Sequence, residues 1–151
     1  MDLVGVILLY TVTGKASFAV LIKILQVSNT SVLVNMTQIN GKVETYSIVS
    51  LPLSFIWNPN ASGNVTYYDG VQAIETTLKG NVKEYVDSYN GIVLGLIING
   101  ENYTLTGASI ELAPGVYKPL PSNHNYDFIE TFVLTAVLVV SFSFLLERVS
   151  K

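Results

Sequence analysis

The sequence predicts a mainly β protein, with a single antiparallel β-sheet domain (a sandwich or an open half-barrel) followed by one C-terminal transmembrane α-helix. In most of the 151 residues, short runs of alternating apolar and polar residues are separated by turn dipeptides, a pattern typical of antiparallel hairpins. Residues 131–146, in contrast, contain no charged residue, Pro or Gly, as in a membrane-spanning helix. We therefore expect a β ectodomain at 1–118, a Pro/Asn stalk at 119–126, a transmembrane helix at 127–147 and a cytoplasmic tail at 148–151.

The composition excludes several classes of function. The chain has no Cys, one His, 13% charged residues and a net charge of -3. Without thiolates and with a single imidazole, it cannot build a disulfide framework, a Cys/His zinc site or an iron–sulfur cluster. The low charge argues against a disordered chain and against a nucleic-acid-binding surface. We expect no cofactor, no metal and no nucleic-acid partner.

The N-terminal residues 3–14 are uncharged and fit three interpretations: a first β-strand, an atypical signal anchor, or the remnant of a signal peptide. Asp2 stands where a signal peptide would carry basic residues. Tyr10 to Thr13, followed by Gly14, is typical of a strand that enters a turn. We therefore favour the strand.

The next part of the chain predicts a three-stranded meander. Residues 18–25 are apolar on both faces, which is typical of a central strand. In 31–39, Val32, Val34 and Met36 share one face, so the side chain of Asn35 is expected to point away from the core. Asn40-Gly41 matches a type I′ hairpin turn that leads into 42–50.

The middle of the chain begins with a loop at 58–64, which is followed by a strand at 65–68 and the Asp69-Gly70 turn. Residues 71–91 fit either a helix or two strands joined at Gly80-Asn81. The acidic residues Glu84 and Asp87, and Glu111 further on, are predicted to lie on the solvated sides of strands.

Residues 85–94 favour the strand interpretation. Their sequence, Tyr-Val-Asp-Ser-Tyr-Asn-Gly-Ile-Val-Leu, resembles a Tyr-x-Asp-x-x-Thr-Gly-x-x-Leu hairpin common in the sheets of secreted envelope proteins, including lipoprotein-carrier-like open barrels. Asn90 stands where that pattern has Thr. The resemblance implies a hairpin and carries no function by itself.

The last part of the β domain contains a second hairpin signal, Asn99-Gly100, between 92–98 and 102–106. Residues 108–112 and 116–118 are expected to finish the sheet. Two prolines and two asparagines then mark the stalk at 119–126, in which His124 is interpreted as an exposed linker residue.

The apolar run 131–146 would form a helix about 24 Å long, slightly short for a bilayer. It is apolar on all sides, whereas a buried C-terminal core helix, the alternative, is normally apolar along one stripe. Asp127 and Glu130 precede the run, and Arg148 and Lys151 follow it. The positive-inside rule then predicts a single-pass protein of the cell membrane with the β domain extracellular and the C-terminus cytoplasmic. The two acids could also hold a cation, but helix stabilisation explains them more simply.

Glycosylation motifs agree with an extracellular domain. Five Asn-x-Ser/Thr sequons occur, against roughly two expected by chance. The candidate acceptors are Asn29, Asn35, Asn60, Asn64 and Asn102.

No constellation of catalytic residues stands out, so we expect no enzyme and rank an exported hydrolase last. The tyrosines are more informative, because the chain contains nine of them. Sheet packing explains most of them, and the alternative is a contact surface for a partner protein or glycan. The candidate residues for this contact surface are Tyr67, Tyr68, Tyr85, Tyr89, Tyr103 and Tyr117.

The chain resembles uncharacterised membrane-anchored surface proteins of thermophilic archaea. Like them, it has low charge, many Asn and Tyr residues, and a small β domain before a C-terminal anchor. The resemblance is one of composition and implies a location, not an activity. We therefore expect a non-enzymatic surface protein that acts as an interaction or structural module, or as an accessory subunit of an envelope or membrane complex. The alternative is a tethered carrier or sensor whose sheet encloses a hydrophobic ligand or lipid.

Overall fold

The computed structural model describes residues 1–121, which form nine β-strands and one short 3-10 helix. The strands are β1 (Ile7–Thr13), β2 (Phe18–Val27), β3 (Ser31–Asn40), β4 (Val43–Pro52), β5 (Asn64–Tyr68), β6 (Val71–Leu78), β7 (Val82–Asp87), β8 (Val93–Ile98) and β9 (Glu101–Ala108). The helix η1 (Leu53–Phe55) lies between β4 and β5. The expected mainly β fold is confirmed.

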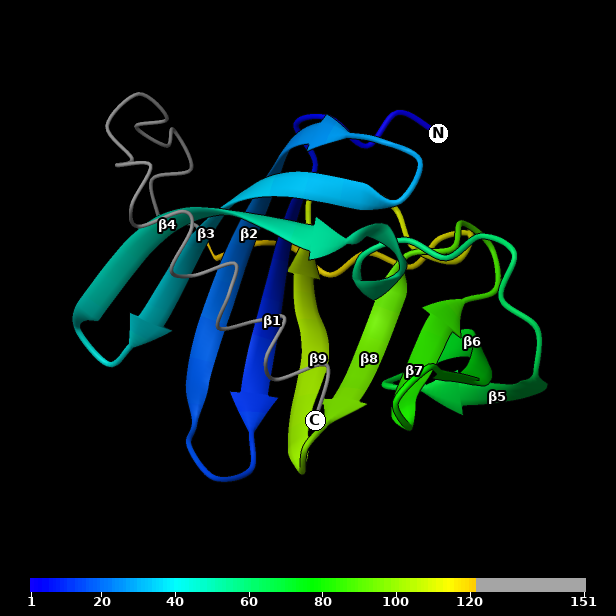
Figure 1. The fold of residues 1–151 in the computed structure, drawn as a ribbon. Coiled ribbons are helices and arrows are strands. Elements are labelled where there is room, and N and C mark those ends of the chain that lie inside the picture. Colours follow the sequence, from blue (N-terminus) through cyan, green and yellow to red (C-terminus); the bar gives the residue numbers. More distant parts are fainter. Residues whose placement is uncertain (122–151) are drawn as a thin grey trace.

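All nine strands belong to one antiparallel sheet of order β4-β3-β2-β1-β9-β8-β7-β6-β5 (Figure 1). Strands that follow one another in the chain pair with each other, with one exception. The β4 and β5 strands are the two edges, and the sheet is joined in its middle by the pairing of β1 with β9. A meander of β1 to β4 and a meander of β5 to β9 are thus united by the two strands farthest apart in the sequence.

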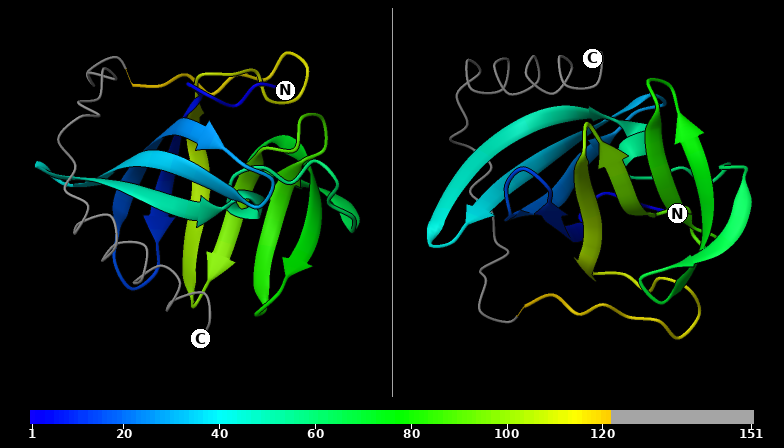
Figure 2. Two further views of the ribbon diagram at one scale, coloured as in Figure 1. Left: turned by 45° about the horizontal axis from the view of Figure 1, so that its top comes forward. Right: turned by 90° about the horizontal axis from the view of Figure 1, so that it is seen from below.

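The sheet is strongly curved, so that β3 and β4 cross in front of β1 and β9 (Figures 1 and 2). β-Bulges, which bend a strand and increase its twist, interrupt the register at Leu9/Tyr10, Ile24/Gln26 and Tyr85/Val86. The curvature brings inward-facing side chains of both meanders into one core. Its fully buried members include Leu8, Val12, Ile24, Val32, Val34, Val49, Leu94 and Leu105.

Two of the predicted hairpin turns are confirmed. Asp69 and Gly70 have φ of 48° and 81°, and Asn99 and Gly100 have φ of 50° and 79°. Positive φ at both central residues is the property of a type I′ turn, whose twist matches that of the strands.

The turn predicted at Asn40-Gly41 is different. Asn40 pairs with Val43, so the central residues are Gly41 and Lys42, and only Gly41 has a positive φ, of 63°. Positive φ at the first central residue alone is the pattern of a type II′ turn. The prediction of type I′ was wrong because Asn40 serves as the last residue of β3, where it extends the ladder.

The ambiguous region 71–91 forms strands, and the hairpin predicted over 85–94 is confirmed by the pairing of β7 with β8. The strands predicted at 108–112 and 116–118 are absent from the described residues. The physical reason is that β9 already has β1 and β8 on its two sides, so the chain beyond Ala108 cannot pair beside β9. It instead makes a turn in which the Leu112 N–H donates to the Val116 carbonyl.

Among residues 1–121, no helix is long and apolar enough to cross a bilayer. The predicted transmembrane helix at 127–147, the tail at 148–151 and His124 lie outside the described residues.

Candidate functional site

A buried carboxyl group lies in the middle of β7. The side chain of Glu84 is 0% exposed, and it shares its face of the strand with the buried Val82 and Val86. These two valines belong to a small apolar cluster with Val93 and Leu96 of β8. An ionisable group in such surroundings is a candidate for function, because a charge is costly to bury without a partner.

One oxygen of the Glu84 carboxyl is bonded and the other is not. Oε1 accepts a hydrogen bond of 2.9 Å from Nδ2 of Asn58. Oε2 is buried and has no hydrogen-bond partner among residues 1–121. Burial raises the pKa of Glu84 to about 7, and the bond from Asn58 opposes this shift only in part. Glu84 therefore gains or loses a proton near neutral pH.

Tyr10 of β1 lies close enough to Glu84 for the two groups to interact electrostatically. Its hydroxyl is fully buried and donates a 2.7 Å hydrogen bond to the carbonyl oxygen of Val93. Val93 stands at the bulge between β7 and β8, where the ladder is irregular. Burial, and then the negative charge of Glu84, raise the pKa of Tyr10 above its ordinary value, so its hydroxyl stays protonated as a donor.

The loop that carries Asn58 spans residues 53–63, and we call it the cover loop. An isolated bridge pairs Trp57 with Ile92. The Asn58 N–H donates to the Gly91 carbonyl at 2.8 Å, and the Trp57 indole donates to the Asn90 carbonyl at 2.8 Å. The cover loop is thereby held against the turn between β7 and β8, over Glu84.

Gly91 is required at this junction. Its φ of 82° lies in the region that favours glycine, and a Cβ atom there would lie 2.6 Å from Cα of Pro59 in the cover loop. Both the turn and the close approach of the two backbones therefore depend on glycine at this position.

A second buried carboxyl, Asp87, organises the same turn. It is 2% exposed, and Oδ1 accepts a 2.8 Å hydrogen bond from the Tyr89 N–H. Asn90 accepts from the Ile92 N–H through its side-chain oxygen and donates to the Glu111 carbonyl. Burial raises the pKa of Asp87, whereas its bonds from the backbone lower it. Asp87, which matches the hairpin motif, and Asn90, which stands in place of its Thr, thus both serve the geometry of the turn.

The prediction that Glu84 and Asp87 are solvated was wrong, since the cover loop and neighbouring strands bury both. The position of Glu84 between two valines of the same face was the signal in the sequence. Glu111, the third predicted acid, is half-buried and accepts a hydrogen bond from the Tyr117 hydroxyl. Among the described residues no group of three or more His, Cys, Asp or Glu side chains could hold a metal ion.

The six tyrosines of the candidate contact surface divide into two groups. Tyr67, Tyr89 and Tyr117 are exposed, at 73%, 61% and 65%. The other three are half-buried: Tyr68 and Tyr85 stack with their ring centroids 4.4 Å apart, and Tyr103 packs against the core. Only the first three present whole rings to solvent.

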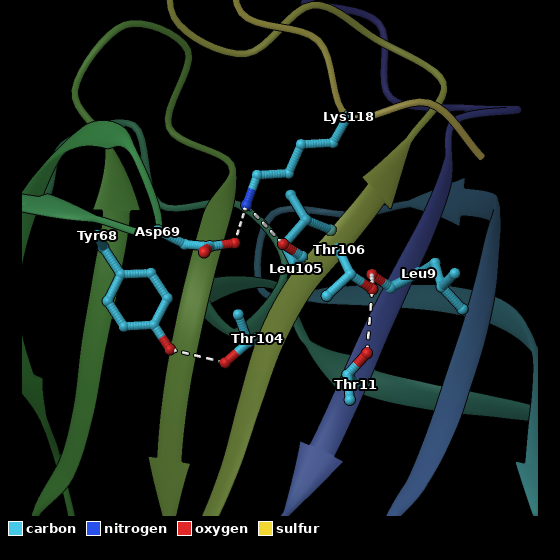
Figure 3. A network of polar contacts seen from close by, with 8 residues as sticks. All are labelled: Leu9, Thr11, Tyr68, Asp69, Thr104, Leu105, Thr106 and Lys118. Carbon is cyan, nitrogen blue, oxygen red and sulfur yellow. Dashed lines mark hydrogen bonds and ion pairs between the residues drawn. The ribbon is translucent and has the colours of Figure 1, made fainter. Parts of the chain in front are cut away.

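Tyr68 also takes part in a polar network on β9 (Figure 3). Its ring occupies the space beside Gly95 of β8, and its hydroxyl shares a 2.9 Å hydrogen bond with Thr104. Nearby, the ammonium group of Lys118 donates to the Leu105 carbonyl at 2.8 Å and forms an ion pair with Asp69. These contacts tie the β5–β6 turn and the segment after β9 to the middle of the sheet.

The predicted glycosylation sites differ in accessibility. Asn29, Asn60, Asn64 and Asn102 are exposed. Asn35 lies on the face of β3 opposite Val34, as predicted, but it is only 2% exposed. The sequons therefore do not offer equivalent positions on the folded domain.

Exposed apolar side chains gather on the two edge strands. Among the described residues, Val43 and Tyr46 on β4 are 66% and 56% exposed, and Val65 and Tyr67 on β5 are 62% and 73% exposed. The sequence did not single out Val43, Tyr46 or Val65, because local patterns do not reveal which strands become edges.

Comparison with protein-family models, with curated proteins and with solved structures found no match to this chain.

Proposed function

We propose that this chain is a non-enzymatic, membrane-anchored surface protein whose β domain acts as an interaction or structural module. In this proposal the domain is an open half-barrel, and a C-terminal helix at 127–147 anchors it with the domain outside. The membrane part is supported by the sequence, in which residues 131–146 carry no charge. With this membrane anchor, the module would act as an accessory subunit of an envelope or membrane complex.

The observation that carries the interaction role is the exposure of large apolar side chains on the edge strands. Four of the eight exposed large hydrophobic side chains in the described part of the chain lie on β4 and β5. An edge strand offers a row of backbone N–H and C=O groups that another extended chain can pair with. Aromatic and branched side chains beside that row add apolar contact area.

The carrier alternative has less support. A carrier needs interior volume for its ligand, and here the inward-facing side chains of both meanders contact one another in one core. The stacked rings of Tyr68 and Tyr85 also occupy the space beside Gly95. These side chains favour a module that binds at its surface.

Two measurements on the full-length protein test the proposal. Protease added to intact cells should remove the β domain and leave a membrane fragment of about 25 residues, as expected for one spanning helix with short flanks. Crosslinking in the same membranes should give an adduct with a partner. Protection of the whole chain from the protease would contradict the proposed topology.

Single substitutions on the two edge strands test which strand contacts the partner. Tyr46→Lys on β4 and Tyr67→Lys on β5 each place a charge on an edge, a substitution that opposes strand addition. We expect at least one of them to reduce the adduct by about tenfold, which corresponds to the loss of one strong interface contact. Tyr89→Lys is the matched control, since Tyr89 is equally exposed but lies in a turn. An adduct unchanged in both edge variants would refute the edge as the binding surface.

A further inference from the structure

We propose that N-linked glycans on Asn60 and Asn64 cover the β5 edge of the sheet and prevent it from pairing with other chains. This inference rests on the proposed function, because glycosylation requires the β domain to lie outside the membrane.

The two sequons lie at exposed positions close to the start of β5. Asn60 lies in a turn of the cover loop, in which the Ala61 N–H donates to the Asn58 carbonyl at 3.2 Å. Asn64 follows four residues later as the first residue of β5. Both side chains are exposed, and loops and strand ends can adapt to a modifying enzyme more easily than the middle of a sheet.

The sequons within the sheet are less suitable. Asn35 is buried in β3, where it pairs with Lys23 on one side and Ile48 on the other. Asn102 is exposed, but β9 lies between β1 and β8, and the hydroxyl of Thr104 in the same sequon is bonded to Tyr68. In the folded domain, neither of these sequons can therefore leave the sheet to reach a modifying enzyme.

Glycans at Asn60 and Asn64 would prevent the edge strand β5 from pairing with other chains. This strand is an edge of the sheet, it has the sequence NVTYY without a charged residue or proline, and its Val65 and Tyr67 are exposed. Charges and prolines are the usual means of preventing an edge from pairing with other chains. A large hydrophilic glycan attached at the start of the strand, with a second one beside it, blocks the same approach.

The opposite edge of the sheet, β4, has no sequon to carry a glycan. β4 spans ten residues from Val43 to Pro52 and contains no sequon. Its first four residues are all exposed, including Tyr46. Glu44 and Pro52, the charged residue and the proline of β4, stand near its two ends and leave residues 45–51 without either. The two edges therefore differ, and β4 is the one without a sequon.

The modification is a glycosyl transfer from a lipid-phosphate-linked oligosaccharide. The side-chain nitrogen of Asn60 or Asn64 forms a bond to the anomeric carbon of the sugar. The bond from that carbon to the phosphate oxygen breaks, and the lipid phosphate leaves with the electron pair. One amide proton passes to solvent, so the step needs no oxidant or reductant.

Glycopeptide mass mapping of the full-length protein, purified from the membranes of its own host, tests the assignment. We expect sugar on Asn60 and Asn64, and Asn35 without sugar. Bare Asn60 and Asn64 on a protein whose domain is cleaved by external protease would refute this inference and leave the proposed function standing. Bare sites on a protein that is fully protected would instead contradict the proposed topology.

The consequence for β5 is tested with the double variant Asn60→Gln, Asn64→Gln, again as the full-length protein in detergent. We expect it to self-associate in sedimentation at concentrations where the parent stays monomeric, and the further change Val65→Lys should restore the monomer. Asn29→Gln is the matched control, because Asn29 lies in the turn between β2 and β3 and not on β5. A double variant that sediments like the parent would show that no glycan protects this edge.

Discussion

The side-chain amide of Asn58 donates a 2.9 Å hydrogen bond to the carboxyl group of Glu84, and this contact joins the cover loop to the middle of β7. The loop comes from the segment between the two edge strands, whereas β7 lies inside the sheet. A single polar contact therefore connects the cover loop with a buried acid that titrates near neutral pH.

Glu84→Gln should change how stability depends on pH. Burial raises the pKa of Glu84 from 4.5 to about 7, so between these values the folded protein holds a proton that the unfolded chain releases. The free energy of unfolding therefore falls as the pH rises from 4.5 through 7, and it levels off above 7. Glutamine has no charge to bury, and we expect it to raise the free energy of unfolding at pH 8 by up to about 3 kcal/mol.

Denaturant unfolding of the full-length protein in mild detergent, at pH 4.5 and pH 8, measures this effect. The gain should be present at pH 8 and absent at pH 4.5. Glu75→Gln on β6 is the control, since Glu75 is partly exposed and paired with Lys83 at 2.8 Å. The same pH dependence in the parent and in Glu84→Gln would exclude Glu84 as the titrating group.

Asn58→Leu should loosen the cover loop, since it removes the donor to Glu84 and leaves a second carboxyl oxygen buried without a partner. The expected loss is about 1–3 kcal/mol, and it should be larger at pH 8, where the carboxyl is charged. Hydrogen exchange of the backbone amides of Trp57 and Asn58 measures the opening of the loop. In the background of Glu84→Gln the pH dependence of this loss should disappear, and its persistence would contradict a coupling of the two residues.

The local features of the fold could be predicted from the sequence. Asp69-Gly70 and Asn99-Gly100 indicate their hairpins because few residues other than Asn, Asp and Gly adopt positive φ at low cost. The pattern of apolar residues likewise predicts the strands of the first meander, whereas residues 71–91 also fit a helix and are assigned to strands from the hairpin sequence at 85–94. These signals are contained in a few neighbouring residues.

The remaining features depend on contacts between distant parts of the chain. The pairing of Tyr10 with Leu105 joins the two meanders, but nothing in either strand specifies the other, since both would pair with any apolar strand. The burial of Glu84 has the same origin, because it requires the cover loop to lie over β7. For this reason the candidate site was missed, although the strands that carry it were predicted.

Tyr10→Phe should destabilise the protein to a similar extent at every pH between 5 and 8. The change removes the hydroxyl that donates to the Val93 carbonyl and leaves that acceptor at the bulge without this bond. We expect a loss of about 1–2 kcal/mol in denaturant unfolding. Tyr89→Phe removes an exposed hydroxyl and should have little effect. Equal stabilities of the two variants would show that the bond to Val93 contributes nothing measurable.

Gly91→Ala should be the most damaging small substitution at the site. Two costs combine there: a φ of 82°, which L-residues rarely adopt, and a Cβ atom that would lie 2.6 Å from Cα of Pro59. Gly115→Ala measures the cost of the positive φ alone, because Gly115 has a φ of 79° but no atom within 4 Å of the added Cβ. We expect a loss of about 1 kcal/mol for Gly115→Ala, and at least about twice as much for Gly91→Ala, in which the backbones must separate. Faster hydrogen exchange at Asn58 in Gly91→Ala alone would locate the difference at the cover loop, whereas equal losses in the two variants would mean that the close approach to Pro59 costs nothing.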